Sequence, residues 1–454
     1  MLEIVDLRGF TGDPSPMMPR ATADLGAART AVREVVRTVR ERGDAGLIEC
    51  EMRFGRERVD YLRIPEWRIE QALDECPGSL RDALESAAAR IHDYHARQAG
   101  EERAPFWRIG PGHAQVGEET RPIRRAGCYV PGGRAAYPST VLMTAIPARA
   151  AGVSEIAVCV PPSADGRVHA ATLTACAIAG VDEVYACGGA QAVAAMAYGT
   201  ESIRRVDKIV GPGSIWVTLA KHEVAMDVGV DSFAGPTEVA IIADGTAPPE
   251  FLAADLVAQA EHDPLATCLL VTPSRALIDA INDLLPKEVA AASRAADIES
   301  ALRTYGRAIL VDGLEQAVEV VDAFAPEHLE LALVDADSWL PKISNAGAIF
   351  IGVWSPVSLG DYVAGTNHVL PTAGASRFAS PLRVSDFIKS TATIRFEPAG
   401  IEWVAPWAVA IAGEEGLDAH ARALNVRLDH IHSSMSQDGS AHEAPESPAA
   451  GEPL

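Results

Sequence analysis

Two polar side chains end an apolar helical pattern in "DLVAQAEHDP", residues 255–264. Residues three apart on a helix share one face, so Gln259 and His262 would point the same way. The structural interpretation of this amide and imidazole is a helix end capped by polar side chains, at which a partly buried histidine finds a hydrogen bond. The helix alone does not decide whether the pair also has a chemical role.

A second group of reactive side chains lies in "FAPEHLEL", where Glu327 precedes His328. Pro326 disfavours helical geometry at the residue before it and therefore indicates a loop at Ala325. A carboxylate beside an imidazole could supply a base and a proton shuttle in an active site. The alternative interpretation is an exposed polar turn before a strand.

The stretch "SPVSLGDYVAGTNHVLPTAG" holds Asp361, Asn367 and His368. Its glycines and prolines predict a loop of about twenty residues, a length that is uncommon in compact domains unless the loop is functional or disordered. This stretch also carries apolar residues, which favours an ordered loop. The carboxylate of Asp361 could reach a metal, and His368 could reach a substrate.

The last segment with possible ligands is "AGEEGLDAHAR", where Glu415 and His420 lie on either side of Gly416. We expect a helix to restart near this glycine. Asp418 is a rival ligand, and the segment by itself is typical of an exposed helix start.

Three glycine-rich turns, "GCYVPGG", "GGAQAV" and "GPGSIWV", lie at predicted strand ends or lead into predicted helices. Such turns can bring backbone N–H groups against phosphates. None is GxGxxG followed by an acidic residue about twenty positions on, so the dinucleotide fingerprint is absent, and so are the P-loop, HExxH and GxSxG motifs. Cys128, in the first turn, has no histidine or aspartate beside it, which favours a packed, inert thiol over a nucleophile.

The elements that must position these residues follow a regular pattern. Residues 27–99 carry apolar side chains at helical spacing, and from about residue 123 short β-rich runs alternate with alanine-rich helical runs. This alternation is typical of βαβ units and a parallel sheet. The predicted strands fall into two groups, at 123–236 and 237–375, which indicates two α/β lobes or one larger sheet. Residues after 390 are mostly helical and amphipathic in pattern.

Composition narrows the functional class. The 454 residues suffice for two or three domains. The formal charge of -23, from 39 basic and 62 acidic residues, argues against nucleic acid or an anionic membrane as partner. The first residues do not resemble a signal peptide, and no apolar run has the length of a membrane span. Seven scattered cysteines without a CxxC pair favour reduced thiols over disulfides or a thiolate zinc site.

Taken together, these segments resemble the histidinol dehydrogenase family. The similarity covers nearly the whole chain up to about residue 432, and it is carried by "RERGDAGLIE", "GCYVPGGRAAYPSTVLMTAIPARAAGV", "GPGSIWVTLAK", "DSFAGPTEV", "AQAEHDP", "FAPEHLEL", "SLGDYVAGTNHVLPT" and "EGLDAHARAL". Each segment is modestly specific, whereas their joint occurrence in this order is very specific. Two positions depart from the family pattern: Thr237 stands where serine is frequent, and Ser214 stands where asparagine is usual.

The resemblance implies an α/β fold with two incomplete Rossmann-like domains, parallel sheets and small N- and C-terminal helical segments, in an intertwined cytoplasmic homodimer. It implies a first α/β domain that carries most of the metal and catalytic site and a second α/β domain on the NAD side. The expected divisions are an N-terminal arm (1–26), the first α/β domain (27–128 and 237–378), the second (129–236), a C-terminal helical segment that reaches the partner subunit (379–432) and a disordered tail (433–454).

The resemblance also implies an NAD-dependent, zinc-containing enzyme that oxidises L-histidinol through L-histidinaldehyde to L-histidine with two NAD, the last steps of histidine biosynthesis. Glu327 and His328 would be the catalytic residues. One Zn²⁺ per subunit would be bound by Gln259, His262, Asp361 and His420, the last supplied by the other subunit. The implied substrate contacts are Thr237, Gln259, His262, Glu327, His328, Asp361, His368, Glu415 and His420, and the implied NAD contacts are Tyr129, Gln191 and Ser214.

Three other functions are consistent with the residues. A zinc hydrolase would use the same ligands with Glu327 as base and would need no nicotinamide. An NAD-dependent dehydrogenase of a related amino alcohol would differ only in the shape of its pocket. An inactive scaffold would keep the polar clusters to stabilise a dimer, but the intact ligand set and the Glu-His pair argue against it.

Overall fold

The computed structural model describes residues 1–20, 25–55, 61–102, 106–109, 115–132, 135–232 and 235–438. The chain forms two compact units. The first comprises Met1–Glu102 and Pro122–Lys389, and the second comprises Arg103–Arg121 and Ser390–Leu454. Each unit is therefore built from segments that lie far apart in the sequence.

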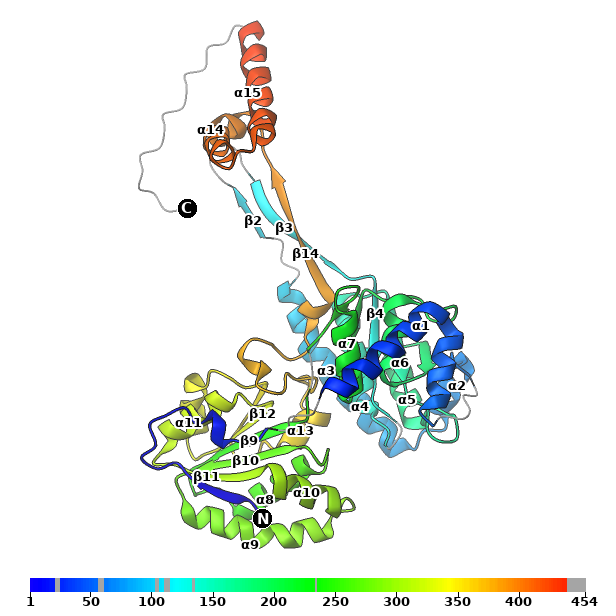
Figure 1. Ribbon diagram of the computed structural model, residues 1–454, viewed down its shortest axis with the longest axis vertical. Coiled ribbons are helices and arrows are strands. Elements are labelled where there is room, and N and C mark those ends of the chain that lie inside the picture. The colour runs from blue at the N-terminus through cyan, green and yellow to red at the C-terminus, as the bar shows by residue number, and fades with distance from the viewer. Residues whose placement is uncertain are drawn as a thin grey trace. The chain divides into compact units, whose positions relative to one another are not determined.

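The first unit contains a five-stranded parallel sheet with the strand order β6-β5-β4-β7-β8 (Figure 1). Numbered along the chain, this order is 3-2-1-4-5, so the direction of winding reverses between β4 and β7. Its strands are β4 (Arg125–Tyr129), β5 (Glu155–Val160), β6 (Glu183–Ala186), β7 (Lys208–Val210) and β8 (Gly229–Val230).

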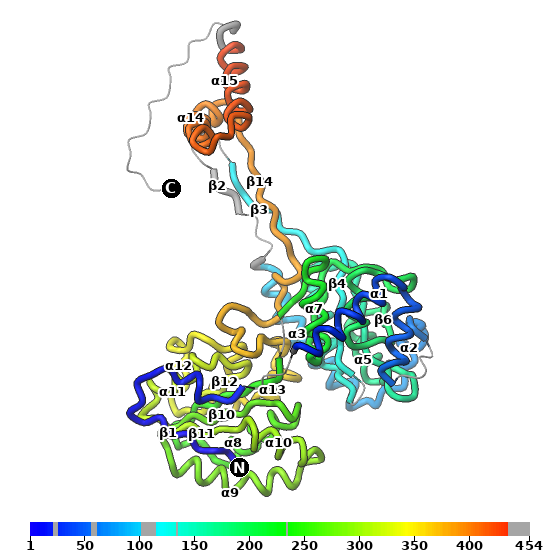
Figure 2. Tube along the Cα trace, in the orientation of Figure 1, coloured from blue at the N-terminus to red at the C-terminus, as the bar shows by residue number. Residues whose placement is uncertain are grey.

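The same unit contains a six-stranded parallel sheet with the order β1-β11-β10-β9-β12-β13. Its five later strands repeat the 3-2-1-4-5 order, and β1 adds to the outer edge, where Glu3 pairs with Arg307. Figure 2 shows the N-terminal segment beside β11. The strands are β1 (Glu3–Asp6), β9 (Glu238–Ala243), β10 (Thr267–Thr272), β11 (Gly306–Leu310), β12 (His328–Ala332) and β13 (Ala348–Ile351).

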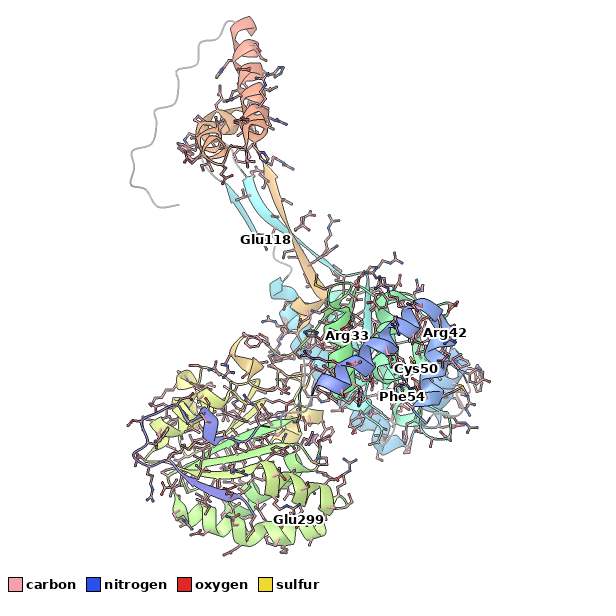
Figure 3. The ribbon with its side chains drawn as sticks, in the orientation of Figure 1. Arg33, Arg42, Cys50, Phe54, Glu118 and Glu299 are labelled. Atoms are coloured by element: carbon pink, nitrogen blue, oxygen red, sulfur yellow. The ribbon has the colours of Figure 1, made fainter. Side chains whose placement is uncertain are left out.

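Seven helices surround the five-stranded sheet and cover both of its faces. Alternate strand residues enter different cores, with Cys128 in one and Tyr129 in the other, because successive strand side chains point to opposite faces. Helix α1, on which Figure 3 labels Arg33, Arg42 and Cys50, contacts α6 and α7. The helices are α1 (Leu25–Arg53, interrupted at Gly43), α2 (Glu66–Asp74), α3 (Gly78–Glu102), α4 (Pro138–Ala151), α5 (Ala170–Ile178), α6 (Gly189–Tyr198) and α7 (Ile215–Val224).

The six-stranded sheet is covered in the same way. One core contains side chains of α8, α9 and α10, and the core of the opposite face contains side chains of α11 and α12. These helices and the short α13 are α8 (Pro249–Ala260), α9 (Arg275–Ala291), α10 (Ala295–Tyr305), α11 (Leu314–Phe324), α12 (Ala336–Trp339) and α13 (Val357–Tyr362). Short 3-10 turns occupy η1 (Ser15–Met17), η3 (Leu340–Lys342), η4 (Ala375–Arg377) and η5 (Val384–Phe387).

The predicted alternation of strands and helices is confirmed, and so is the helical region 27–99, which forms α1, α2 and α3. The buried residues of these helices, such as Val39 and Ile91, share cores with the five-stranded sheet. Their packing therefore groups α1, α2 and α3 with the five-stranded sheet, whereas the domain division expected from the sequence grouped residues 27–128 with 237–378.

The second unit contains a three-stranded sheet of order β14-β3-β2 and two helices that contact each other. Its elements are β2 (Phe106–Ile109), β3 (Gln115–Pro122), β14 (Ile388–Arg395), α14 (Pro398–Glu414) and α15 (Asp418–Asp438). The prediction of a helical segment over 379–432 is wrong at β14, where Thr391, Thr393 and Ile394 favour extended backbone.

The predicted disordered tail is only partly described. Helix α15 continues through residue 433 to Asp438, and residues 439–454 lie outside the described part of the chain. None of the described helices is long and apolar enough to cross a bilayer.

Candidate active site

Glu327 and His328 lie where α11 gives way to β12. Ala325 adopts a left-handed backbone, with φ of 51°, and this turn directs Glu327 and His328 into the start of the strand. Their exposed fractions are only 7% and 5%. The alternative of an exposed polar turn is therefore wrong, because both reactive side chains are buried at the amino edge of the six-stranded sheet.

A chain of hydrogen bonds connects Glu327 to Gln259. Thr237 Oγ1 donates to Glu327 Oε2 at 2.5 Å, and the backbone N–H of Glu238 donates to the same oxygen at 2.9 Å. Gln259 Nε2 donates to Thr237 Oγ1 at 2.6 Å. Because the threonine hydrogen is used on the carboxylate, its oxygen must accept from the amide, which fixes the amide orientation. Thr237 thus links a candidate base to a candidate ligand.

The oxygen of the Gln259 amide takes no part in these hydrogen bonds. Gln259 is 2% exposed, and its Oε1 has no hydrogen-bond partner among the described residues. A buried acceptor without a partner carries a desolvation cost of about 1–3 kcal/mol. A cation at this position would remove that cost.

His262 and Asp361 present two more donor atoms. His262 Nδ1 donates to the carbonyl of Ala258 at 3.1 Å, which leaves Nε2 with a lone pair, 3.7 Å from Asp361 Oδ2. This distance is too long for a hydrogen bond. It approaches the ~3.4 Å that separates two ligand atoms bound tetrahedrally to zinc at ~2.0–2.2 Å. The amide, imidazole and carboxylate together form a donor set that suits this metal.

The segment that carries Asp361 differs from the predicted twenty-residue loop, because its first part forms the helix α13. Residues after the helix hold the segment in place. His368 Nδ1 contacts the carbonyl of Asp361 at 2.9 Å, and its Nε2 lies 3.3 Å from Thr140 Oγ1. Asn367 is buried and donates to the carbonyl of Met143 at 2.7 Å, so its role is structural.

The remaining predicted ligands lie in the second unit. Glu415 directly follows α14, and His420 is in the first turn of α15. Both side chains are exposed. Within the described parts of the chain, no three His, Cys, Asp or Glu side chains come together as a metal-binding group. The donor set in the first unit comprises one amide, one imidazole and one carboxylate.

Burial sets the protonation of the Glu-His pair. It raises the pKa of Glu327 to about 7; the hydrogen bonds from Thr237 and Glu238 oppose this rise, and the charge of Asp361 adds to it. Burial lowers the pKa of His328, so its imidazole is neutral near pH 7. His328 Nδ1 donates to the carbonyl of Glu238 at 3.0 Å, which leaves Nε2 as a basic nitrogen.

Glu238 and Arg20, which lie beside this pair, were not predicted from the sequence. Burial raises the pKa of Glu238 to about 7, although Arg20 Nε donates to Glu238 Oε1 at 2.9 Å and lowers it. The guanidinium carbon of Arg20 also lies 4.4 Å from the centre of the Phe324 ring. The available signal was a glutamate that opens the otherwise apolar strand "EVAIIA".

The three predicted NAD contacts lie beyond the carboxyl ends of the five-stranded sheet. Tyr129 ends β4, and its hydroxyl oxygen accepts from the N–H of Gly189 at 3.0 Å. Gln191, in the first turn of α6, donates through Nε2 to Glu51 Oε1 at 2.7 Å. Ser214 is the exposed N-cap residue of α7, and its side chain makes no capping hydrogen bond.

A cavity of about 140 Å³ lies at the same edge of the five-stranded sheet. It is lined by Pro131, Gly132, Ala135, Ala136, Val160, Pro161, Ser163, His169 and Thr172. Cys128, on the neighbouring strand, is fully buried, and burial raises the pKa of its thiol to about 12. This confirms the interpretation of Cys128 as a packed, inert residue.

Comparisons with known proteins identify relatives over nearly the whole chain. The family model for histidinol dehydrogenase matches residues 18–428. The chain is 47% identical over 395 residues to the histidinol dehydrogenase of Parasynechococcus marenigrum, covering 87% of this chain and 90% of the relative. It is 45% identical over 427 residues to the histidinol dehydrogenase of Thermobifida fusca, covering 93% of this chain and 97% of the relative.

A solved structure shows the same fold. The crystal structure of histidinol dehydrogenase from Elizabethkingia anophelis superposes with a TM-score of 0.89 at 33% identity, covering 95% of this chain and 99% of that one. The chain therefore belongs to the histidinol dehydrogenase family, whose members are NAD-dependent oxidoreductases of histidine biosynthesis.

Proposed function

We propose that this chain oxidises L-histidinol through L-histidinaldehyde to L-histidine, with one NAD reduced in each step. The observation that carries the proposal is the buried Glu327–His328 pair beside the donor atoms of Gln259, His262 and Asp361. A neutral imidazole and a carboxyl group that titrates near neutral pH are the two bases that a four-electron oxidation requires.

Gln259, His262 and Asp361 would hold one Zn²⁺ per subunit, with His420 of the partner subunit as the fourth ligand. The unpartnered Oε1 of Gln259 and the bare Nε2 of His262 support this assignment. Bound zinc would supply a positive charge that fixes the substrate by its imidazole and amine. Thr237, Glu327, His328 and His368 would complete the substrate contacts in the same subunit, and Glu415 of the partner subunit would pair with the substrate ammonium.

His328 acts first in the proposed mechanism. Its Nε2 removes the hydroxyl proton of the alcohol while the hydride on the same carbon leaves for the nicotinamide. The hydrogen bond from Nδ1 to the carbonyl of Glu238 holds the ring and stabilises the imidazolium that forms. A positioned base of this kind typically contributes ~10²–10⁴-fold to the rate.

Glu327 acts on the aldehyde. Thr237 and Glu238 both donate to Oε2, which leaves Oε1 to accept a proton from the attacking water. The oxygen of this water bonds to the carbonyl carbon while the C=O π bond breaks, and the former carbonyl oxygen takes the proton that His328 holds from the first step. The resulting hydrate then loses a hydroxyl proton to the neutral His328 as the second hydride leaves for a second NAD. Both oxidations therefore use one pair of residues.

The five-stranded sheet would bind NAD as an incomplete Rossmann-like domain. Its order, 3-2-1-4-5, is that of a doubly wound sheet with one strand fewer, and ligands of such sheets bind beyond the carboxyl ends near the reversal point. Tyr129, Gln191 and Ser214 lie at this edge. The absence of GxGxxG fits a helix start at Gly188 whose N–H already donates to Glu51 Oε1 at 2.9 Å.

We further propose that the chain forms a homodimer with shared active sites. We also propose that this dimer is located in the cytoplasm. Assigning His420 and Glu415 to the sites of the partner subunit requires the dimer. None of the seven cysteines, all of which lie in the described residues, forms a disulfide, as expected for a reducing compartment.

The stoichiometry of NADH formation tests the proposal. We expect two NADH per L-histidinol, with L-histidine as product, when purified protein is given excess NAD. One NADH would leave Glu327 without a role and indicate an enzyme that stops at the aldehyde. No NADH with zinc present would favour a hydrolase or another alcohol.

A further inference from the structure

Two carboxyl groups face each other next to the proposed site. Asp255 on α8 and Glu330 on β12 are joined by a side-chain hydrogen bond. Glu330 is 5% exposed. Neither carboxyl group forms an ion pair within the described residues. No part of the proposed mechanism uses this pair.

Such a pair must share a proton. A hydrogen bond between two carboxyl groups needs one of them protonated, and two buried carboxylates in contact would repel each other. Burial raises the pKa of both Asp255 and Glu330, and the charge of Asp255 raises the pKa of Glu330 further. The proton therefore belongs to the pair near neutral pH.

The pair connects the elements that carry the proposed ligands. Asp255 lies one helical turn before Gln259 on α8, and His262 follows the same helix. Glu330 is two residues after His328, on the same face of β12. Glu330 Oε1 also accepts from the N–H of Val357, the first residue of α13, at 3.0 Å. Since α13 carries Asp361, one carboxyl pair holds α8, β12 and α13 together.

We propose that Asp255 and Glu330 form a one-proton clasp that positions the zinc ligands of α8 and α13 relative to each other. Both are positioning residues, because they act through Gln259, His262 and Asp361. The inference rests on the proposed function in one respect, the assignment of these three residues as ligands. Loss of the shared proton would open the clasp and weaken zinc binding.

Substitutions at Asp255 separate the hydrogen bond from the charge. In Asp255→Asn the amide N–H donates to the Glu330 carboxylate without a titratable proton, so the clasp stays closed at every pH. Asp255→Ala removes it. Glu250→Gln, at the exposed first turn of the same helix, is the matched control. The readout is the zinc dissociation constant, measured by competition with a chromogenic chelator on the full chain at about pH 7 and about pH 9.

We expect Asp255→Ala to weaken zinc binding roughly tenfold at pH 7, the effect of about 1.4 kcal/mol. Asp255→Asn should bind within about threefold of the wild type at pH 7. From pH 7 to pH 9 the wild type should lose affinity relative to Asp255→Asn, because only the wild type can lose the shared proton. Glu250→Gln should follow the wild type at both pH values.

Equal zinc dissociation constants for the wild type and Asp255→Ala would contradict the proposed clasp. So would a wild type whose dissociation constant matches that of Asp255→Asn at both pH values. If the alanine variant does not fold, the comparison of the wild type with Asp255→Asn still tests the proposal. A wild type that binds no zinc would overturn the metal site and the clasp together, whereas the other results overturn the clasp alone.

Discussion

The hydroxyl group of Thr237 lies between Glu327 and Gln259, donating to the carboxylate and accepting from the amide. This side chain therefore orients both the proposed base of the second oxidation and the proposed amide ligand. The role of Thr237 therefore depends on its hydroxyl group and not on its methyl group.

Replacing Thr237 with valine keeps the shape and removes the hydroxyl group. Loss of a hydrogen bond to a charged group costs about 1.5–3 kcal/mol, so we expect kcat for aldehyde oxidation to fall about 10- to 100-fold. Stopped-flow measurement of NADH from L-histidinaldehyde gives this rate. Thr237→Ser is the control and should stay within about threefold of the wild type, and an equal loss in both variants would assign the effect to packing.

Glu327→Gln should separate the two oxidations. The amide cannot accept a proton from water, so aldehyde oxidation should fall by ~10²–10⁴-fold. The first hydride transfer depends on His328 and should change far less. A single-turnover experiment with L-histidinol would then yield one NADH instead of two. Equal losses in both steps would contradict the separate roles of these residues.

The pKa of Glu327 predicts how the second step depends on pH. The carboxylate is the active form and its pKa is raised to about 7, so the rate of aldehyde oxidation should rise with pH and level off above about 7. His328 adds no second transition there, because its pKa is lowered and it is already neutral. A pH–rate profile with L-histidinaldehyde checks this, and a flat profile from pH 5 to pH 8 would contradict it.

The same shift affects stability with the opposite sign. A carboxyl group whose pKa is higher in the folded state lowers the free energy of unfolding as pH rises from about 4.5 to about 7. The loss is on the order of 3 kcal/mol for this buried group. In metal-free protein, Glu327→Gln should therefore be more stable than the wild type at pH 8, and this gain should disappear at pH 5, as measured by urea unfolding.

Glu51 should affect NAD binding through Gln191. Its carboxylate accepts from the Gln191 amide N–H group and from the N–H of Gly188, so it fixes which end of the amide faces the carboxyl edge of the sheet. We expect Glu51→Gln to raise the KM for NAD about 5- to 20-fold, because the amide can then turn. The KM for L-histidinol and the zinc content should not change. Glu49→Gln, at an exposed position of the same helix, should leave all three values unaltered.

Shared sites can be tested by mixing two inactive variants. His328→Ala lacks the base, and His420→Ala lacks the proposed ligand for the partner subunit. A mixed dimer has one site that carries both changes and one site that carries neither, so refolding an equimolar mixture should restore roughly a quarter of the wild-type activity. Mixed dimers that are confirmed by mass but show no recovery would contradict the shared site.

The sequence predicted the alternating α/β pattern because apolar strands and alanine-rich helices are local signals. It did not show that both sheets repeat one strand order, because unrelated side chains can fill equivalent positions in two cores. The burial of Glu327 was equally hidden, since it depends on strands β9 and β12 becoming neighbours. Arg20 and Glu238 are more than two hundred residues apart in the sequence, so no local pattern predicts their contact.

The candidate site was predicted mainly through the family resemblance. Local spacing suggested Gln259 with His262 and Glu327 with His328, but it could not join the two pairs. The hydroxyl group of Thr237 joins them in the fold. The Asp255–Glu330 pair had no local signal either, because each acid by itself is typical of a solvated helix or strand residue.

The place of β1 at the edge of the six-stranded sheet has a consequence during protein synthesis. Glu3 leaves the ribosome long before its partner Arg307 is translated. At ~5–20 residues per second, roughly 15–60 s pass between the two events. In that interval the five-stranded sheet and its helices emerge in full. The nascent chain can therefore fold this sheet while β1 remains unpaired, because β11 has not yet been translated.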